Sequence, residues 1–199
     1  MLPGTIAKTV HWAFGQDIAV LPRIFDDGIT LAVMERRLDS ALTLAVRAQL
    51  CHPRGLEWQW RGAPGPAMQE DLARRLPAPE AGEALVEDIG TIAEAMAYLF
   101  STETIGIRLR TLEGAMCPRF HVDNLPVRLV STYAGPASEW LPEHAVNRDG
   151  LGAPHPHKPD IVADPGAIQQ LGVGDIALLK GGGWVGNETP DSVTDDITA

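Results

Sequence analysis

The sequence predicts an α+β fold, with most helices in its first half and most strands in its second. Up to residue 103, apolar residues recur every three or four positions, which is the spacing of one helix face: Leu85, Ile89, Ile92, Ala93, Met96 and Phe100. From 104 to 112 they instead alternate with polar or small residues, as in a half-buried strand. Two later apolar runs, 127–133 and 175–180, predict further strands. Helices followed by strands, without an internal repeat, favour α+β over an alternating α/β fold.

The composition is typical of one globular domain without membrane spans. Of 199 residues, 45% are hydrophobic and 21% are charged, close to the average for soluble proteins. The formal net charge of −10 opposes binding to nucleic acid or to an anionic membrane, so neither is expected as a partner. No apolar run approaches the roughly 20 residues of a membrane span, and the first residues lack a signal-peptide pattern. With only two cysteines, Cys51 and Cys117, these features favour the cytoplasm.

Local signals place the elements of the first half. Residues 29–33 form a short apolar run, which predicts a buried strand. A helix should begin after Asp39 or Ser40, since either can cap it. It should end near Pro53, because the residue before a proline resists the α conformation. Residues 61–82 are rich in proline and glycine, which indicates a connector with a helical turn or two.

We expect residues 1–187 to form a single domain. Its mostly helical part spans 1–103 and its mostly β part spans 104–187. Residues 188–199 are acidic and polar without a strand period, which predicts a disordered tail.

One stretch of the β part can carry chemistry. It reads Cys117-Pro-Arg-Phe-His121-Val-Asp123 and lies between two predicted strands. If His121 to Asp123 is extended, alternate side chains project from the same face, so the imidazole and the carboxylate can converge. Both groups are ligands of iron(II) and zinc, which predicts a divalent-metal site at His121 and Asp123. The other interpretation is a solvated turn in which Asp123 or Asn124 caps a local backbone group.

Three neighbouring residues are candidates for the same site. Cys117 would add a thiolate, which suits zinc better than iron, or it is a buried small hydrophobic residue. Arg128 follows the His-x-Asp turn on the next predicted strand, where it can orient an anionic ligand, and Arg119 is a second candidate for this role. For each arginine the alternative is simple exposure to solvent. A small molecule is therefore the expected partner.

Two strings in the β part resemble a bacterial family, the domain of unknown function 1826. They read CPRFHVDNLPVRLVSTYAGPASEWLPE and GDIALLKGGGWVGN, and the similarity extends from about Ile29 to Asn187. The family has no established activity, so this resemblance implies relatives rather than a reaction.

A looser resemblance is to cupin-like double-stranded β-helix proteins, among them the oxygenases that depend on iron(II) and 2-oxoglutarate. In those proteins one strand ends in His-x-Asp, which His121 and Asp123 match. A later strand begins with Gly-Asp, as at Gly174-Asp175. The resemblance implies N-terminal helices packed on a jelly-roll sheet half, with iron(II) as the cofactor.

The chain departs from both patterns after Asn187, where the family resemblance implies a His-Arg pair and a final strand. No histidine follows His157, so the last strand and the third ligand of a facial triad are expected to be missing. A substitute ligand would come from His144, His155 or His157. A natural loss of the last strand or a shifted reading frame would explain the difference. A sheet without its last strand exposes an edge, which predicts a homodimer through that edge or low stability.

Three functions therefore stay open. The first is an oxygenase-like metal enzyme, in which His121 and Asp123 bind the metal and Arg128 orients an anionic substrate. The second is a non-catalytic, cupin-like module that binds a metal or a small ligand. The third is a truncated, inactive member of the family.

Overall fold

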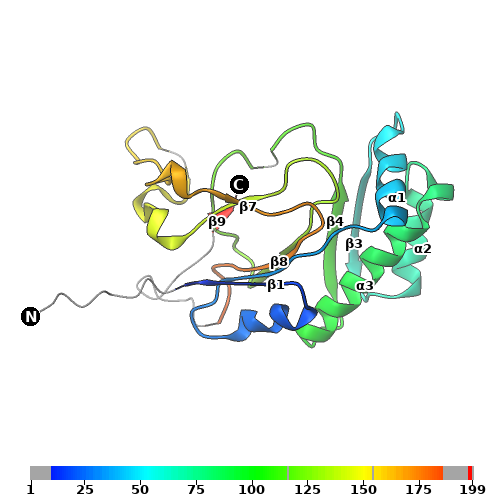
Figure 1. Ribbon diagram of the computed structural model, residues 1–199, viewed down its shortest axis with the longest axis horizontal. Coiled ribbons are helices and arrows are strands. Elements are labelled where there is room, and N and C mark those ends of the chain that lie inside the picture. The colour runs from blue at the N-terminus through cyan, green and yellow to red at the C-terminus, as the bar shows by residue number, and fades with distance from the viewer. Residues whose placement is uncertain (1–9, 116, 154, 186–196, 199) are drawn as a thin grey trace, which may run out of the picture. The chain divides into compact units, whose positions relative to one another are not determined.

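The computed structural model describes residues 10–115, 117–153, 155–185 and 197–198. The chain divides into two compact units (Figure 1). The helix unit is Arg37–Met116, and the sheet unit combines Met1–Arg36 with Cys117–Ala199. Within the described ranges, no helix is both long enough and apolar enough to cross a membrane.

The helix unit consists of helices and a two-stranded sheet. Its elements are α1 (Ser40–Cys51), β3 (Glu57–Gly62), α2 (Pro66–Arg75), the 3-10 turn η2 (Pro79–Ala81), α3 (Glu83–Leu99) and β4 (Ile105–Arg110). β3 and β4 pair antiparallel, with Trp58 opposite Leu109. In Figure 1, α1, α2 and α3 lie on the same side of this pair. The alternation over 104–112 forms β4 as predicted, whereas β3 has no counterpart among the predicted strands.

Helix α1 begins and ends where its local chemistry predicts. The Asp39 carboxylate accepts a hydrogen bond from the Leu42 backbone N–H at 2.8 Å, which satisfies a donor that the first turn leaves unpaired. The helix ends at Cys51, two residues before Pro53. Inside the unit, the buried Gln49 amide donates to the Ala78 carbonyl at 2.9 Å and accepts from the Ala78 N–H at 2.8 Å. This pair of bonds ties α1 to the chain that enters η2.

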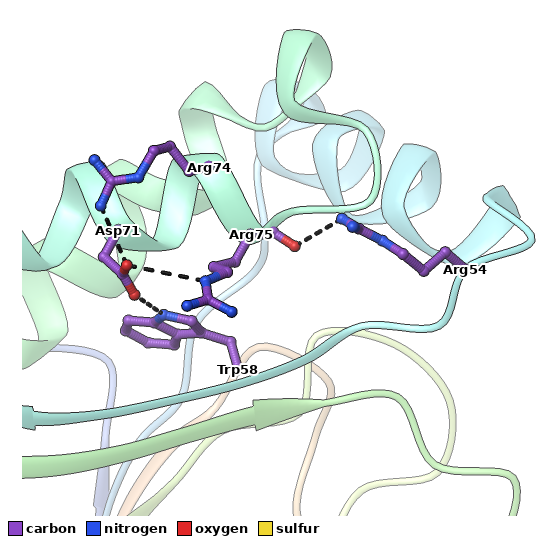
Figure 2. A network of polar contacts seen from close by, with 5 residues as sticks. All are labelled: Arg54, Trp58, Asp71, Arg74 and Arg75. Atoms are coloured by element: carbon purple, nitrogen blue, oxygen red, sulfur yellow. Dashed lines mark hydrogen bonds and ion pairs between the residues drawn. The ribbon is translucent and has the colours of Figure 1, made fainter.

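A polar network fixes α2 over β3 (Figure 2). The Trp58 indole N–H donates to the Asp71 carboxylate at 2.9 Å, and Arg74 donates to its other oxygen at 3.2 Å. Arg75 lies 4.0 Å from the same carboxylate, while Arg54 donates to the Arg75 carbonyl at 2.9 Å. The Trp58 hydrogen bond, assisted by the two neighbouring arginines, lowers the pKa of Asp71 although partial burial opposes the shift.

The sheet unit contains two small sheets. Its strands are β1 (Trp12–Gly15), β2 (Leu31–Met34), β5 (Val127–Val130), β6 (Glu139–Leu141), β7 (Gln169–Gln170), β8 (Ile176–Lys180) and β9 (Ile197–Thr198). Its 3-10 helices are η1 (Ile18–Phe25), η3 (Glu143–Ala145), η4 (Arg148–Gly150) and η5 (Pro165–Ala167). The larger sheet has the order β1-β2-β8-β5, and the smaller one has the order β7-β6-β9. β1 and β2 are parallel, whereas the other pairs are antiparallel.

The core of the sheet unit lies on one face of the larger sheet. Alternate residues of β2 and β8 face Trp140 of β6 and its neighbours in a buried cluster: Leu31, Val33, Ala137, Trp140, Leu171, Ala177 and Leu179. Trp12 of β1 meets Trp140 edge to face, with ring centroids 5.2 Å apart. η1 contacts β1, β2 and β8 and buries Val20, Leu21 and Ile24. With every residue of β8 buried, this strand forms the centre of the unit.

The α+β class is confirmed, but the expected jelly roll is not found in the part of the chain that the structure describes. A jelly roll is built from antiparallel strands in two Greek keys, whereas β1 and β2 pair in parallel. The described sheets also stay open rather than closing into a barrel. The His-x-Asp and Gly-Asp strings therefore occur here on a different arrangement of strands.

The last residues of the chain were expected to lack a strand, but two of them form one. Ile197 and Thr198 form β9, which pairs with β6 through Leu141 opposite Ile197. Because β7 pairs with the same strand, β6 is the central strand of its sheet. The rest of the predicted tail, 188–196 and 199, lies outside the described residues.

Candidate functional site

The predicted metal-binding stretch lies in the sheet unit, immediately before β5. Its backbone is held by the three glycines that follow β8. Gly182 donates to the Asp123 carbonyl at 2.8 Å, and Gly181 donates to the Pro126 carbonyl at 3.0 Å. Gly183 donates to the Leu125 carbonyl at 3.3 Å. The turn after the central strand thus supports the loop that carries Asp123.

Only glycine suits the first position of this triglycine turn. A Cβ atom at position 181 would lie 2.2 Å from the Leu125 carbonyl oxygen and 2.6 Å from that of Asp123. Both contacts are with backbone, which cannot rotate away as a side chain could. At position 182 the nearest such contact is 3.7 Å, an ordinary van der Waals distance. The close approach of two backbones therefore explains Gly181 in particular.

A buried lysine lies beside the same turn. Lys180 donates to the Asp26 carbonyl at 3.3 Å, and its ammonium lies 4.8 Å from the centroid of the Trp184 ring. The backbone N–H of Trp184 in turn donates to the Gly181 carbonyl at 3.0 Å. Burial lowers the pKa of Lys180, and the nearby carboxylates of Asp27 and Asp26 partly oppose this shift. Lys180 thereby links the end of η1 to the turn that supports Asp123.

Within the stretch, the structure brings His121 and Asp123 together. Their Nε2 and Oδ1 atoms are 3.6 Å apart, too far for a direct hydrogen bond. The second Asp123 oxygen contacts Nε of Arg128, which reaches it from β5. The side chain of His121 is 40% exposed and that of Asp123 is 18% exposed, so solvent reaches the pair from the imidazole side.

The other ring nitrogen of His121 decides the tautomer. Nδ1 lies 3.1 Å from the Arg119 carbonyl, and because a carbonyl can only accept, Nδ1 must carry the hydrogen. In the neutral ring, Nε2 then presents its lone pair to the Asp123 carboxylate. Two electron-pair donors face each other across this gap, an arrangement that suits a cation between them.

The same contacts disfavour a catalytic acid–base pair. In such pairs the carboxylate orients one ring nitrogen, and the other nitrogen faces the substrate. Here one nitrogen of His121 is bonded to the Arg119 carbonyl and the other is directed at Asp123. The nitrogen that would face a substrate in such a pair, Nε2, is therefore directed at the carboxylate instead.

The remaining predicted site residues lie elsewhere or have other contacts. Arg119 uses its guanidinium to donate to the Gly150 carbonyl at 2.8 Å. The Arg128 guanidinium contacts the Asp123 carboxylate. Cys117 is half-buried, and the described residues contain no group of three or more His, Cys, Asp or Glu side chains suited to a metal. The structure therefore places two of the three predicted ligands together, without Cys117.

Sequence reasoning missed the supporting role of the triglycine turn. The signal was present, because three consecutive glycines directly after an apolar strand indicate a close backbone approach. The partner of that approach, 123–126, lies more than fifty positions earlier in the chain, so no local pattern could identify it.

Comparison with known proteins identifies the family but not a reaction. The family model described as "Protein of unknown function (DUF1826)" matches residues 15–191. The chain belongs to the DUF1826 family. No curated protein and no solved structure matches this DUF1826 chain. The family assignment made from the two strings is therefore confirmed, while the cupin-like resemblance receives no support from any match.

Proposed function

We propose that this DUF1826 protein is a binding module in which His121 and Asp123 hold a divalent cation that a small ligand helps to coordinate. The observation that carries the proposal is the 3.6 Å separation of two electron-pair donors, His121 Nε2 and Asp123 Oδ1. Two ligands of one zinc ion are about 2.9 Å apart at a right angle and about 3.4 Å apart at a tetrahedral angle. A small side-chain movement would bring the pair to such a distance.

The surroundings of the pair support a metal site in two further ways. Histidines that bind metals commonly donate their second ring N–H to a carbonyl or a carboxylate, as His121 does to Arg119. The carboxylate of Asp123 keeps one oxygen free of the Arg128 contact. The guanidinium neutralises part of the carboxylate charge, so we expect a modest affinity and an exchangeable ion.

Zinc and iron(II) are both compatible with an imidazole and a carboxylate. Cys117 would favour zinc if it joined them, and its assignment as a ligand stays a proposal. Arg128 contributes by orienting the Asp123 carboxylate, which replaces its predicted role on an anionic substrate.

The oxygenase interpretation is a narrower form of the proposal, and the described residues do not fit it. Iron(II) oxygenases of this kind need two histidines and one carboxylate on a single face of the metal. Within the described ranges, the chain brings only one histidine and one carboxylate together here. We therefore derive no reaction step through iron or 2-oxoglutarate.

Metal titration of the full chain tests the proposal. After treatment with a chelator, the protein should bind Zn²⁺ in isothermal titration calorimetry and iron(II) in anaerobic equilibrium dialysis. His121→Ala and Asp123→Asn should each weaken binding by roughly tenfold or more. Loss of a residue that merely contacts a metal ligand already costs about that much, and these two are the proposed ligands themselves. His52→Ala, which removes a histidine from the helix unit, should leave the affinity unchanged.

Unchanged metal affinity in both site variants would overturn the proposal. In that case the His121 ring signals in NMR would not respond to Zn²⁺. Oxygen uptake that depends on 2-oxoglutarate and is lost in His121→Ala would instead support the oxygenase form.

A further inference from the structure

The sheet unit contains an open groove outside the His121–Asp123 pair. Its volume is about 730 Å³, within the range of roughly 300–1,000 Å³ typical of small-molecule sites. Two segments line it, 118–120 on one side and 155–165 on the other. The first segment leads directly into His121, but neither metal-site residue belongs to the lining.

The wall formed by 159–165 is held by backbone contacts. Val162 forms a β-bridge with Val146, and Asn147 donates to the Ile161 carbonyl at 2.7 Å. Gly150 packs so closely that a Cβ atom there would lie 2.7 Å from the Pro159 carbonyl oxygen. These contacts give the groove one fixed side before any ligand is present.

Two cationic side chains of the lining are held at neighbouring points. Arg119 donates to the Gly150 carbonyl at 2.8 Å, and Lys158 donates to the carbonyl of Leu151, the residue after Gly150. Among the described residues neither forms an ion pair with an acidic side chain. The lining includes one carboxylate, Asp160.

This arrangement is unusual for so acidic a chain. With a formal net charge of −10, the average surface field is negative, yet two positive groups line this groove and donate to the carbonyls of adjacent residues without an ion-paired carboxylate. Two positive groups that line one groove both attract an anion bound in it. The hydrogen bonds to these carbonyls leave donors available for a ligand, because a guanidinium has five N–H donors and an ammonium has three.

The rest of the lining is mainly apolar. Phe120 is half-buried on one side and Ile161 is buried on the other, with several prolines around them: Pro118, Pro156, Pro159 and Pro165. These side chains offer rigid apolar contact to the body of a ligand. An inorganic anion would leave them unused.

We propose that the groove binds a small organic anion, with its carboxylate or phosphate group at Arg119 and Lys158 and its apolar body against Phe120. This inference goes beyond the metal-binding function, because it does not require an ion at His121. It assigns Lys158 and Asp160 opposite effects on affinity, one attracting the anion and the other repelling it.

Calorimetric titration of the full, metal-free chain tests the proposal, with phenyl phosphate, benzoate and inorganic phosphate as probes. We expect at least one of the two organic anions to bind more tightly than inorganic phosphate does. Lys158→Gln should weaken its binding by about tenfold, the contribution of one charge-assisted hydrogen bond. Asp160→Asn should strengthen the same binding, because it removes the negative charge from the lining.

Arg37→Gln is the matched control, since it removes one positive charge from an exposed position in the helix unit. It should leave the affinity unchanged. Equal effects of Lys158→Gln and Arg37→Gln, or a weaker complex in Asp160→Asn, would overturn the proposal. Inorganic phosphate binding as tightly as both organic probes would overturn the role of the apolar wall. Because the probes are tested without metal, these outcomes are independent of the His121 titration.

Discussion

Gly181 and Gly182 are adjacent in the chain, yet they differ in what surrounds them. A Cβ atom on the first would clash with two carbonyl oxygens of the loop that carries Asp123, whereas on the second it would lie an ordinary 3.7 Å from the Asp123 oxygen. Both donate a backbone hydrogen bond to that loop. Alanine keeps the backbone N–H at both positions, so neither substitution removes a hydrogen bond donor. A difference between the two alanine variants therefore reports the steric clash at position 181.

Gly181→Ala should therefore destabilise the protein, whereas Gly182→Ala should not. We expect Gly181→Ala to cost about 1–3 kcal/mol in the free energy of unfolding, as overpacking of a close contact does. Urea unfolding measures this value, and Gly182→Ala should stay within about 0.5 kcal/mol of the wild type. Gly181→Ala should also weaken Zn²⁺ binding, since it displaces the loop at Asp123. Equal stability of the two variants would show that the loop and the turn are not in close contact.

At the scale of elements, the contact of α2 with β3 depends on a charged hydrogen bond. The Asp71 carboxylate accepts from Trp58 on β3 and from Arg74 on its own helix. These contacts favour the ionised form, so the pKa of Asp71 is lower in the folded protein than in the unfolded chain. A carboxylate whose pKa is lowered by folding stabilises the protein at pH values above its pKa in the unfolded chain. That stabilisation is lost as the pH falls through its pKa in the folded protein.

Trp58→Phe should reduce this acid sensitivity. The phenyl ring keeps part of the packing but has no N–H, so it removes the largest contribution to the shift. Between about pH 5 and pH 2, the wild type should lose more stability than the variant does. Urea unfolding at a series of pH values measures the two slopes.

Trp60→Phe provides the control, because the Trp60 indole donates to the neutral Ala63 carbonyl at 3.1 Å. This variant should keep the pH dependence of the wild type even if its stability at neutral pH is lower. If Trp58→Phe and Trp60→Phe show the same slope as the wild type, the Asp71 hydrogen bond is not the source of the acid sensitivity.

At the scale of the whole molecule, the charges are unbalanced. The chain has 26 acidic residues against 16 Lys and Arg. Self-repulsion of this excess opposes the compact state, and salt screens it over a distance of about 30 Å at 0.01 M and about 10 Å at 0.1 M. The groove lining, by contrast, has two cations, Arg119 and Lys158, and one carboxylate, Asp160.

The melting temperature should consequently rise with salt. Between about 10 mM and 150 mM KCl at pH 7, we expect an increase of about 2–4 °C, which corresponds to roughly 1 kcal/mol for a chain of this size. Differential scanning calorimetry measures the change. The affinity for phenyl phosphate should move in the opposite direction, because the same salt screens its attraction to Lys158. A melting temperature that falls with salt would show that favourable ion pairs outweigh the repulsion.

Elements that depend on near neighbours in the chain were predictable. The end of α1 before Pro53, the apolar stripe of α3 and the alternation of β4 all follow from interactions within a few residues. The same holds for the convergence of His121 and Asp123, which lie two positions apart and approach to 3.6 Å. In each case the spacing of side chains follows from the local backbone conformation.

Elements defined by distant partners were not predictable in this way. β1 and β9 are short strands that become recognisable through their pairing with β2 and β6. The expected jelly roll was not confirmed among the described residues for the same reason, since a His-x-Asp string does not specify which strands become neighbours. The Arg128 contact also depends on the position of β5 relative to the preceding loop.

By itself, the sequence determined the α+β class and membership of the DUF1826 family, and it predicted a metal site at His121 and Asp123. The tertiary structure alone decided that Gly181 must be a glycine, that Arg128 lies on Asp123, and that Arg119 and Lys158 meet at one groove. The physical reason is the range of the interactions involved. Backbone sterics and side-chain periodicity act over a few residues, whereas sheet pairing and close backbone contact join segments that the chain order leaves far apart.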